Sequence, residues 1–317
     1  MTPAASGAVV LTALRVEARA LRRGGVPVLR TGMGPRHASR AGSRAMRRLP
    51  PAAPVAVAGF CGALDSGIRA GDVVVATEVR DDAGAVPLPG WAPLAAALRR
   101  RGLPVHAGPL VTSARPVLRR RGRDRLAGTG ALAVDMESAA AVRALPGHPA
   151  AVVRVVTDTV RTGPTSLPGH GLAAYRALAA AAPAITEWAE AARIERVVLA
   201  TTPGGSGESG GELAVRAVAA GADLVLVVGP PDSSSTSRLV DAAGRAGTAA
   251  RLVEDESDID LRWLAGVRVL GLTAGLEAPA AMLDRVLATL RGYGAVAVDA
   301  LPVADESIEF TLQKEVG

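Results

Sequence analysis

The chain has 317 residues, 49% of them hydrophobic, and a formal net charge of +6, which is enough material for two ordinary domains with separate cores. Its one cysteine, Cys61, excludes an intramolecular disulfide and any metal or iron–sulfur site that needs several thiolates. We therefore expect a reducing, cytoplasmic location and no bound metal or cofactor.

The positive charge comes almost entirely from arginine, and only 2% of the residues are aromatic. Because base-stacking platforms need aromatic side chains, we expect no nucleic-acid partner. Arginine clusters at residues 99–101 and 119–121 are interpreted as a solvated surface, with peripheral attraction to an anionic membrane as the alternative. No apolar run approaches the length of a membrane span.

The first segments predict alternating strands and helices. Residues 8–13 are an apolar strand that leads into a helix carrying Glu17 in its first turns, where an acid also suits the helix dipole. Residues 26–30 predict a short strand. The turn that follows, residues 31–36, contains glycines such as Gly34 that let the backbone approach a ligand closely.

A glycine-rich stretch comes next. Residues 55–64 predict a central strand that runs into a Gly-x-x-Gly loop beginning at Gly59, and residues 70–76 predict another strand. Residues 81–91 then pass directly into a helix that ends near Arg101.

Carboxylates end two further predicted strands. Residues 133–142 turn from a strand into an alanine-rich helix through Met136 and Glu137. A carboxylate at such a turn points toward the carboxyl edge of the sheet, where open α/β sheets bind ligands, although Glu137 could also merely cap the helix. Residues 152–158 predict a buried strand that ends in Asp158, for which a simple turn is the alternative.

In this order, the segments resemble those of the nucleoside phosphorylase and nucleosidase superfamily, over roughly residues 8 to 190. The resemblance implies that residues 1–194 form an α/β domain of three layers around a central mixed sheet. It implies that Glu17 activates an attacking water and that Asp158 protonates N7 of a departing purine, because the base otherwise leaves as a poor anion. The positions that the resemblance assigns to substrate binding are Gly34, Gly59, Phe60, Met136 and Glu137.

Phosphorolytic relatives of the uridine phosphorylase kind place an arginine and a hydroxyl residue beside the glycine loop, where this chain has Val57 and Phe60. Without these donors a phosphate dianion loses charge-assisted hydrogen bonds, so the sequence favours hydrolysis. Arg36 is a candidate anion-binding residue, and inorganic phosphate stays the alternative co-substrate. Residues 81–91 are shorter than the insertion usual in nucleosidases, and Pro116 stands where a purine-stacking phenylalanine is expected, which together suggest an open site.

Residues 195–317 begin a second α/β pattern, for which we expect a smaller domain with a parallel sheet. Residues 225–239 and 271–279 resemble the C-terminal third of hydroxymethylbutenyl diphosphate reductase. That family needs three cysteines for an iron–sulfur cluster, and this segment has none. The resemblance therefore implies no reductase activity and no cluster, with Ser233 and Ser234 as candidate anion-binding residues and packing or dimer support as the alternative.

The combination resembles the hopanoid-associated phosphorylase branch, whose members remove adenine from adenosylhopane. We therefore expect cleavage of the N-glycosidic bond of a small-molecule nucleoside with a lipid-linked 5′ substituent. Methylthioadenosine, adenosylhomocysteine or aminofutalosine are alternative substrates, and a non-catalytic scaffold of an isoprenoid pathway is the alternative class. Because relatives assemble, a homo-oligomer is expected.

Overall fold

The computed structural model describes residues 7–117, 119–159, 167–201, 208–294 and 297–302. The chain divides into two compact units. The first comprises Met1–Arg196, Glu254–Arg268 and Ala280–Ala297, and the second comprises Val197–Val253, Val269–Pro279 and Val298–Gly317. The predicted boundary between residues 194 and 195 stays a prediction.

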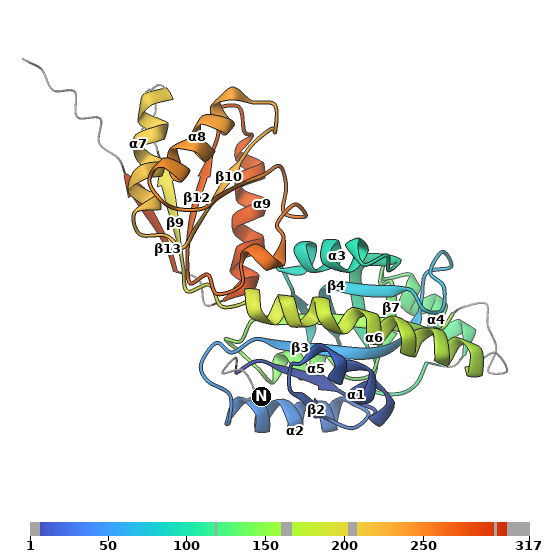
Figure 1. The fold of residues 1–317 in the computed structure, drawn as a ribbon. Helices are drawn as coiled ribbons and strands as arrows, with labels where there is room; N and C mark the ends of the chain where they lie inside the picture. Colours follow the sequence, from blue (N-terminus) through green and yellow to red (C-terminus); the bar gives the residue numbers. More distant parts are fainter. Residues whose placement is uncertain (1–6, 118, 160–166, 202–207, 295–296, 303–317) are drawn as a thin grey trace, which may run out of the picture. The chain divides into compact units, whose positions relative to one another are not determined.

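A mixed sheet forms the centre of the first unit, as the sequence predicts (Figure 1). Its order is β2-β1-β3-β7-β6-β4-β5, with β8 paired to both β3 and β4. The strands are β1 Val9–Thr12, β2 Val28–Arg30, β3 Val55–Ala63, β4 Val73–Asp81, β5 Gly84–Pro87, β6 Val105–Thr112, β7 Ala133–Asp135 and β8 Ala150–Asp158.

Five of these strands close a ring, because β3 pairs with β7 as well as with β8. Residues from Val55 onward pair in parallel with β8, whereas Gly62 and Ala63 pair antiparallel with β7. The register shifts between Cys61 and Gly62, which is the signature of a β-bulge. β8 continues to β4, β4 to β6, and β6 to β7, which closes the circuit.

Helices form two further layers on this sheet. α6 packs against β8 and β3 and is contacted by α1 and α3, while α2 packs against α5. Valine-rich strands and alanine-rich helices supply the buried core between these layers. The helices of this unit are α1 Arg15–Leu21, η1 Arg22–Gly24, α2 Pro35–Met46, α3 Trp91–Arg100, α4 Arg120–Ala127, α5 Ser138–Arg143, α6 Leu167–Ala191, η3 Leu261–Trp263, α9 Ala280–Leu290 and η4 Arg291–Tyr293.

The second unit is built on a five-stranded sheet of order β11-β10-β12-β9-β13. β10 runs parallel to both β11 and β12, which confirms the predicted parallel sheet. Within the parts of the chain that the structure describes, no helix has the length and apolar character needed to cross a bilayer. The elements of this unit are β9 Arg196–Thr201, α7 Glu208–Ala219, β10 Leu224–Val228, α8 Ser234–Arg245, β11 Ala250–Val253, β12 Val269–Ala274 and β13 Ala297–Pro302.

Candidate active site

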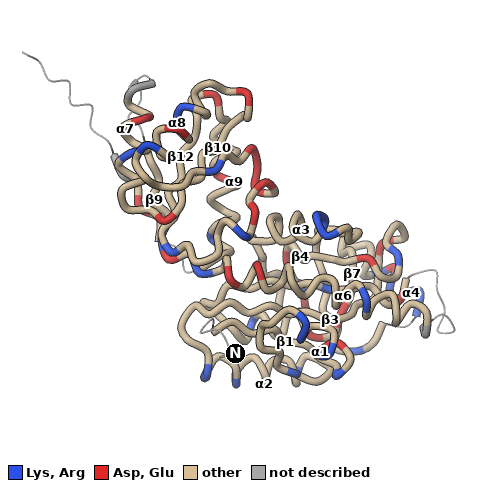
Figure 2. Tube along the Cα trace, viewed as in Figure 1, with Lys and Arg blue, Asp and Glu red and all other residues tan. Residues whose placement is uncertain are grey.

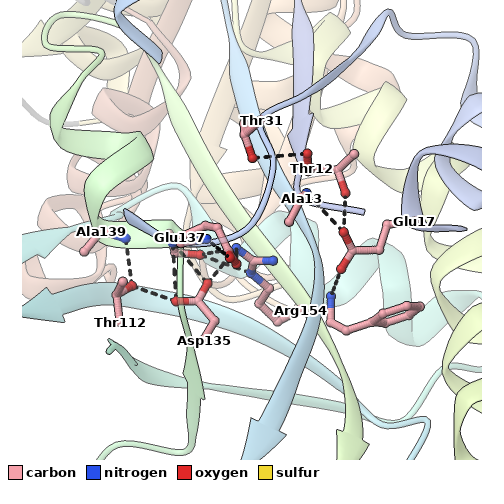
Figure 3. Close-up of polar contacts among 12 residues, drawn as sticks. Thr12, Ala13, Glu17, Thr31, Thr112, Asp135, Glu137, Ala139 and Arg154 are labelled. Atoms are coloured by element: carbon pink, nitrogen blue, oxygen red, sulfur yellow. Dashed lines mark hydrogen bonds and ion pairs between the residues drawn. The ribbon is translucent and has the colours of Figure 1, made fainter. Parts of the chain in front are cut away.

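Glu17 lies in the first turn of α1, with its carboxylate buried among donors (Figure 3). Its Oε2 accepts hydrogen bonds from Thr12 Oγ1 at 2.9 Å, Ala13 N at 3.1 Å and Leu14 N at 2.7 Å. Its Oε1 accepts one from Phe60 N on β3 at 2.7 Å. Because a carboxylate oxygen has two lone pairs, Oε1 can still accept another donor.

Arg154 is a buried cation in the middle of β8, with 1% of its surface exposed. Its Nη2 lies 2.6 Å from Asp135 Oδ2 and 3.7 Å from Glu137 Oε2, and its Nε donates to Ser138 Oγ at 3.1 Å. Burial alone would lower its pKa, but the carboxylates of Asp135, Glu137 and Glu17 raise it. Figure 3 shows Glu17 on one side of this guanidinium and the other two acids on the opposite side.

Glu137 lies directly before α5, and its side chain does not cap that helix. Asp135 takes the capping position instead, accepting the N–H of Ser138 at 3.1 Å. Glu137 Oε1 accepts a 2.7 Å hydrogen bond from the N–H of Gly34, which adopts a φ of +92° that glycine tolerates. Burial raises the pKa of Glu137 above its ordinary value, although Arg154 and the Gly34 N–H lower it.

Asp158 ends β8 in an ion pair with Arg123 of α4. Asp158 Oδ2 faces the Arg123 Nη2 atom, while Oδ1 accepts a hydrogen bond from Thr157 Oγ1 at 3.1 Å. Gly62 pairs with Asp158 on one side and with Val134 on the other, so the bulge in β3 brings the ends of β7 and β8 together. A Cβ on Gly62 would lie only 3.0 Å from the Asp158 carboxylate, which favours glycine there.

These groups share one cavity of about 200 Å³. Glu17, Leu14, Met33, Arg123 and Asp158 are among the residues that line it. Phe60 hydrogen-bonds to Glu17, whereas Gly62 lies two residues further along β3 beside Asp158. The cavity therefore extends along β3 from Glu17 to Asp158. The remaining lining residues are Ala13, Phe60, Cys61, Gly62, Arg115, Pro116, Val117, Val134, Asp135, Met136, Glu137 and Thr157.

Most of the site residues predicted in the first unit converge on this cavity, but three have other surroundings. Gly34 directs its N–H at Glu137 and does not line the cavity. Gly59 lies beside Glu17 and Arg154, since a Cβ on it would come within 2.5 Å of Glu17 Oε1. Arg36 is exposed on α2 and is also outside the lining.

Three functional candidates were not predicted from the sequence, namely Asp135, Arg154 and Arg123. Arg154 is a cation inside the valine-rich run of β8. Because a buried charge needs a partner, this is the local signal that could have indicated a buried ion pair. Asp135 precedes the predicted pair Met136 and Glu137 directly, so the same turn contains it. Arg123 sits in an arginine-rich helix whose sequence does not distinguish it from its exposed neighbours.

Cys61 also lines the cavity, and burial strongly raises the pKa of its thiol. A thiol held in its neutral form is a poor nucleophile and a poor metal ligand. We therefore assign Cys61 to packing of β3.

The second unit has its own polar cluster at the start of α8. Ser233 caps this helix by accepting the N–H of Thr236 at 3.4 Å, and it is buried, whereas Ser234 is exposed. Thr236 is fully buried, and its Oγ1 has no hydrogen-bond partner in the described part of the chain. Gly229 and Gly275 flank that oxygen, because a Cβ on either would approach it to 2.6 Å or 2.5 Å.

Comparisons with known proteins match the two parts of the chain separately. The LytB protein family matches residues 211–291. The 4-hydroxy-3-methylbut-2-enyl diphosphate reductases of Xanthomonas euvesicatoria and Xanthomonas oryzae are both 47% identical over 103 residues. That alignment covers 32% of this chain and 32% or 33% of those proteins, so the chain spans about a third of their length. The predicted resemblance of this region is confirmed.

Solved structures similar to the chain include a Helicobacter pylori methylthioadenosine nucleosidase mutant with 5′-methylthioadenosine, at 16% identity and a TM-score of 0.46. The match covers 55% of this chain and 94% of that protein. The futalosine hydrolase of Helicobacter pylori matches at 15% identity and a TM-score of 0.47, covering 57% and 95% of the two chains.

The family comparison identifies the first part of the chain. The phosphorylase superfamily matches residues 15–188, a span that contains Glu17, Glu137, Arg154 and Asp158. This span is more than half of the 317 residues. The chain therefore belongs to the phosphorylase superfamily.

Proposed function

We propose that the first unit cleaves the N-glycosidic bond of a 5′-substituted adenosine and releases adenine. The observation that carries the proposal is that Glu17, Glu137 and Asp158 line one cavity. Glu137 lies directly before α5 and is held there by the N–H of Gly34. Such a reaction needs an activated nucleophile at one face of the sugar and help for the departing base at the other.

Glu17 is the group that we propose to activate water. Its Oε1 has one hydrogen bond, from Phe60 N, and lies beside Gly59 together with Arg154 Nη1. Nη1 has no hydrogen-bond partner among the described residues, and an unpaired buried donor is costly. A water that accepts from Nη1 and donates to Oε1 would satisfy both. As its oxygen bonds to the anomeric carbon, its proton passes to Glu17.

Asp158 is the group that we propose to assist the base. When the bond from the anomeric carbon to N9 breaks, its electron pair moves onto the purine, which a proton or hydrogen bond at N7 stabilises. Arg123 faces Oδ2 of Asp158, so Oδ1 is the oxygen that would carry this proton. Arg123 fixes the carboxylate in place, and we propose that it is a positioning residue.

Glu137 and Met136 are proposed to hold the ribose. Both line the cavity between the two catalytic carboxylates. The N–H of Gly34 fixes one oxygen of Glu137, and Oε2 lies 3.7 Å from Arg154, which leaves it able to accept from a sugar hydroxyl.

For the 5′ substituent we propose the lipid-linked group of adenosylhopane. Met33 is 60% exposed and lines the cavity, so a long apolar group can continue outward past it. β4 and β5 are joined by a short hairpin, with β5 only four residues long, where a longer covering insertion is usual. The reductase-like second unit is a further link to isoprenoid chemistry.

Incubation with adenosylhopane, methylthioadenosine, adenosylhomocysteine and aminofutalosine, followed by chromatography of the purine, tests the function. All four are 5′-substituted adenosines, so cleavage of any of them releases adenine, and we expect the fastest release from adenosylhopane. Absence of base release from all four would favour the scaffold alternative. A preference for a short 5′ group would refute the adenosylhopane assignment while leaving the reaction type intact.

A second candidate function is anion binding at the start of α8. The buried, unpartnered Thr236 Oγ1 between Gly229 and Gly275 favours it, together with the N–H groups at a helix N-terminus. Titration calorimetry with inorganic pyrophosphate tests it, with Ser233→Ala expected to weaken binding. Identical heats for the two proteins would exclude this site.

A further inference from the structure

The outward side of α2 is an uncompensated basic surface. Arg36, Arg40, Arg44 and Arg47 fall within about 80° of arc on the helix, given about 3.6 residues per turn. All four are exposed, as is Arg48. The buried residues of α2, by contrast, are on the opposite side, facing the sheet and α5. Figure 2 shows the basic positions along α2 in blue. We call Arg36, Arg40, Arg44, Arg47 and Arg48 the α2 arginine face.

Some exposed arginines elsewhere in the protein pair with acids, whereas those of this face do not. Arg143 lies 3.0 Å from Asp81, and Arg101 pairs with Glu187. Throughout the described residues, no carboxylate lies within ion-pair distance of the α2 arginine face. The sequence explains this, because residues 18–64 contain no aspartate or glutamate. Five guanidinium groups over about 18 Å of helix therefore create a strong positive potential.

Two exposed apolar side chains precede these charges in the chain. Met33, three residues before Arg36, is 60% exposed, and Leu29 on the edge strand β2 is 38% exposed. Large apolar side chains combined with arginines are typical of surfaces that lie in a bilayer interface. Met33 belongs at the same time to the lining of the catalytic cavity. The rim of the cavity is thus continuous along the chain with the basic helix.

We propose that the α2 arginine face, with Met33 and Leu29, docks the first unit onto an anionic lipid bilayer. This docking extends the proposed function, because its purpose rests on the proposed cleavage of a lipid-linked nucleoside. With the purine at Asp158, we place the 5′ group beside Met33, an exposed residue of the cavity lining. A nucleoside carried by a lipid would then enter the cavity from the bilayer without exposing its apolar part to water.

Charge and composition favour lipid headgroups over nucleic acid as the partner. Residues 15–48 contain no phenylalanine, tyrosine or tryptophan to stack on bases. The same segment contains no asparagine or glutamine to read base edges. Its exposed Met33 and Leu29 have no role on a phosphate backbone, whereas they gain from contact with acyl chains.

Vesicle sedimentation without nucleoside tests the docking surface. The full chain is mixed with vesicles of phosphatidylcholine alone or with added phosphatidylserine. We expect binding only to the anionic vesicles. Each arginine near such a surface contributes about five-fold to partitioning, so Arg40→Gln with Arg44→Gln should lower it by about 25-fold.

The matched control is Arg121→Gln with Arg125→Gln on α4, which removes the same charge from exposed arginines at the same helical spacing. We expect this control to bind vesicles within about two-fold of the parent. An equal loss in both double variants would show that net charge alone determines binding and would overturn the proposal. Full retention by the α2 variant would overturn it as well.

Two further measurements separate the alternatives. In the first, a labelled DNA duplex competes with anionic vesicles for the protein. Displacement from the vesicles that requires Arg40 and Arg44 would show that the face binds nucleic acid and not lipid. Adenine release from soluble methylthioadenosine should be equal in the α2 variant and the parent, because neither arginine lines the cavity. Since vesicle binding is measured without nucleoside, a failure of the proposed reaction is detected independently of the docking result.

Discussion

The Nη2 atom of Arg154 lies 2.6 Å from Oδ2 of Asp135, and both side chains are 1% exposed. This pair joins β8, which ends in Asp158, to the last residue of β7, two positions before Glu137. Because the pair is buried, it holds its position more firmly than a surface ion pair, in which water and salt screen the charges. It therefore helps to fix the distance between Asp158 and Glu137, the groups that we propose to assist the base and to hold the sugar.

Arg154→Met should lower the free energy of unfolding by about 3–5 kcal/mol, because it leaves the buried carboxylate of Asp135 without its cation. Denaturant unfolding of the purified variant measures the loss. The control is Arg80→Met, which removes a pair with Glu78 whose side chains are 33% and 26% exposed. We expect the control to lose at most about 1 kcal/mol. Equal losses would show that burial does not increase the contribution of the Arg154 pair to the free energy of unfolding.

Asp158→Asn should lower turnover by roughly 10² to 10⁴ while changing substrate binding less, because a group that assists the leaving base acts chiefly in the transition state. Steady-state adenine release measures both effects. Asp124→Asn, an exposed acid of α4 paired with Arg120, is the control and should keep the parental activity. Equal activity of the Asp158 variant and the parent would remove Asp158 from the mechanism.

Glu137→Gln should weaken substrate binding and turnover together, by roughly 10- to 100-fold, because a charged acceptor for the ribose hydroxyls is lost. Its KM and kcat for methylthioadenosine measure the two contributions. A change in kcat alone would contradict a ribose-binding role.

The same substitution should change stability in a pH-dependent way. Because burial raises the pKa of Glu137, the folded chain binds this proton more tightly than the unfolded chain. The stability from Glu137 is therefore complete below its ordinary pKa and is lost as pH rises through the raised folded pKa. Unfolding between roughly pH 4 and pH 8 should show the glutamine variant gaining stability relative to the parent as pH rises. A difference independent of pH would show that Glu137 has the same pKa in both states.

The sequence predicts much of the site because three of its acids follow strands. Glu17 follows β1, Glu137 follows β7 and Asp158 ends β8, and these strand ends meet at one edge of the sheet. The closing of the ring was not predictable, since it depends on the bulge after Cys61 that lets Gly62 pair with both β7 and β8. The local sequence does not predict such a register shift.

Buried ion pairs were the other feature that the sequence did not reveal. Arg154 looks like one charge in a valine-rich strand, and its partner Asp135 lies 19 positions earlier, on a strand with which β8 does not pair. Arg123 is one of several arginines in α4, and only the packing of that helix directs it at Asp158. Arg36 shows the converse, because the rotation of α2 exposes it to solvent.

The purified protein should contain no iron–sulfur cluster, although its second unit resembles part of a reductase. Cluster irons need several thiolates, and Cys61 is the only cysteine and lies buried in the first unit. Iron analysis and the visible spectrum after anaerobic purification measure this. A stoichiometric cluster would refute our interpretation of residues 195–317 as catalytically inactive in reduction.

Cleavage should proceed with water at least as readily as with phosphate. A phosphate dianion beside the anomeric carbon must lose its water, which is unfavourable unless cations or N–H groups replace it. Val57 on β3 is a buried apolar residue, the N–H of Phe60 already donates to Glu17, and Arg36 lies outside the cavity. Beside Glu17 the described residues leave Nη1 of Arg154 as a donor without a partner, and a water that donates to Glu17 Oε1 can accept from it. Analysis of the sugar product with and without added phosphate measures the partition, and free sugar should form at the same rate in both. Ribose 1-phosphate formed in proportion to added phosphate, with no turnover in its absence, would show instead that other groups of the protein bind the dianion.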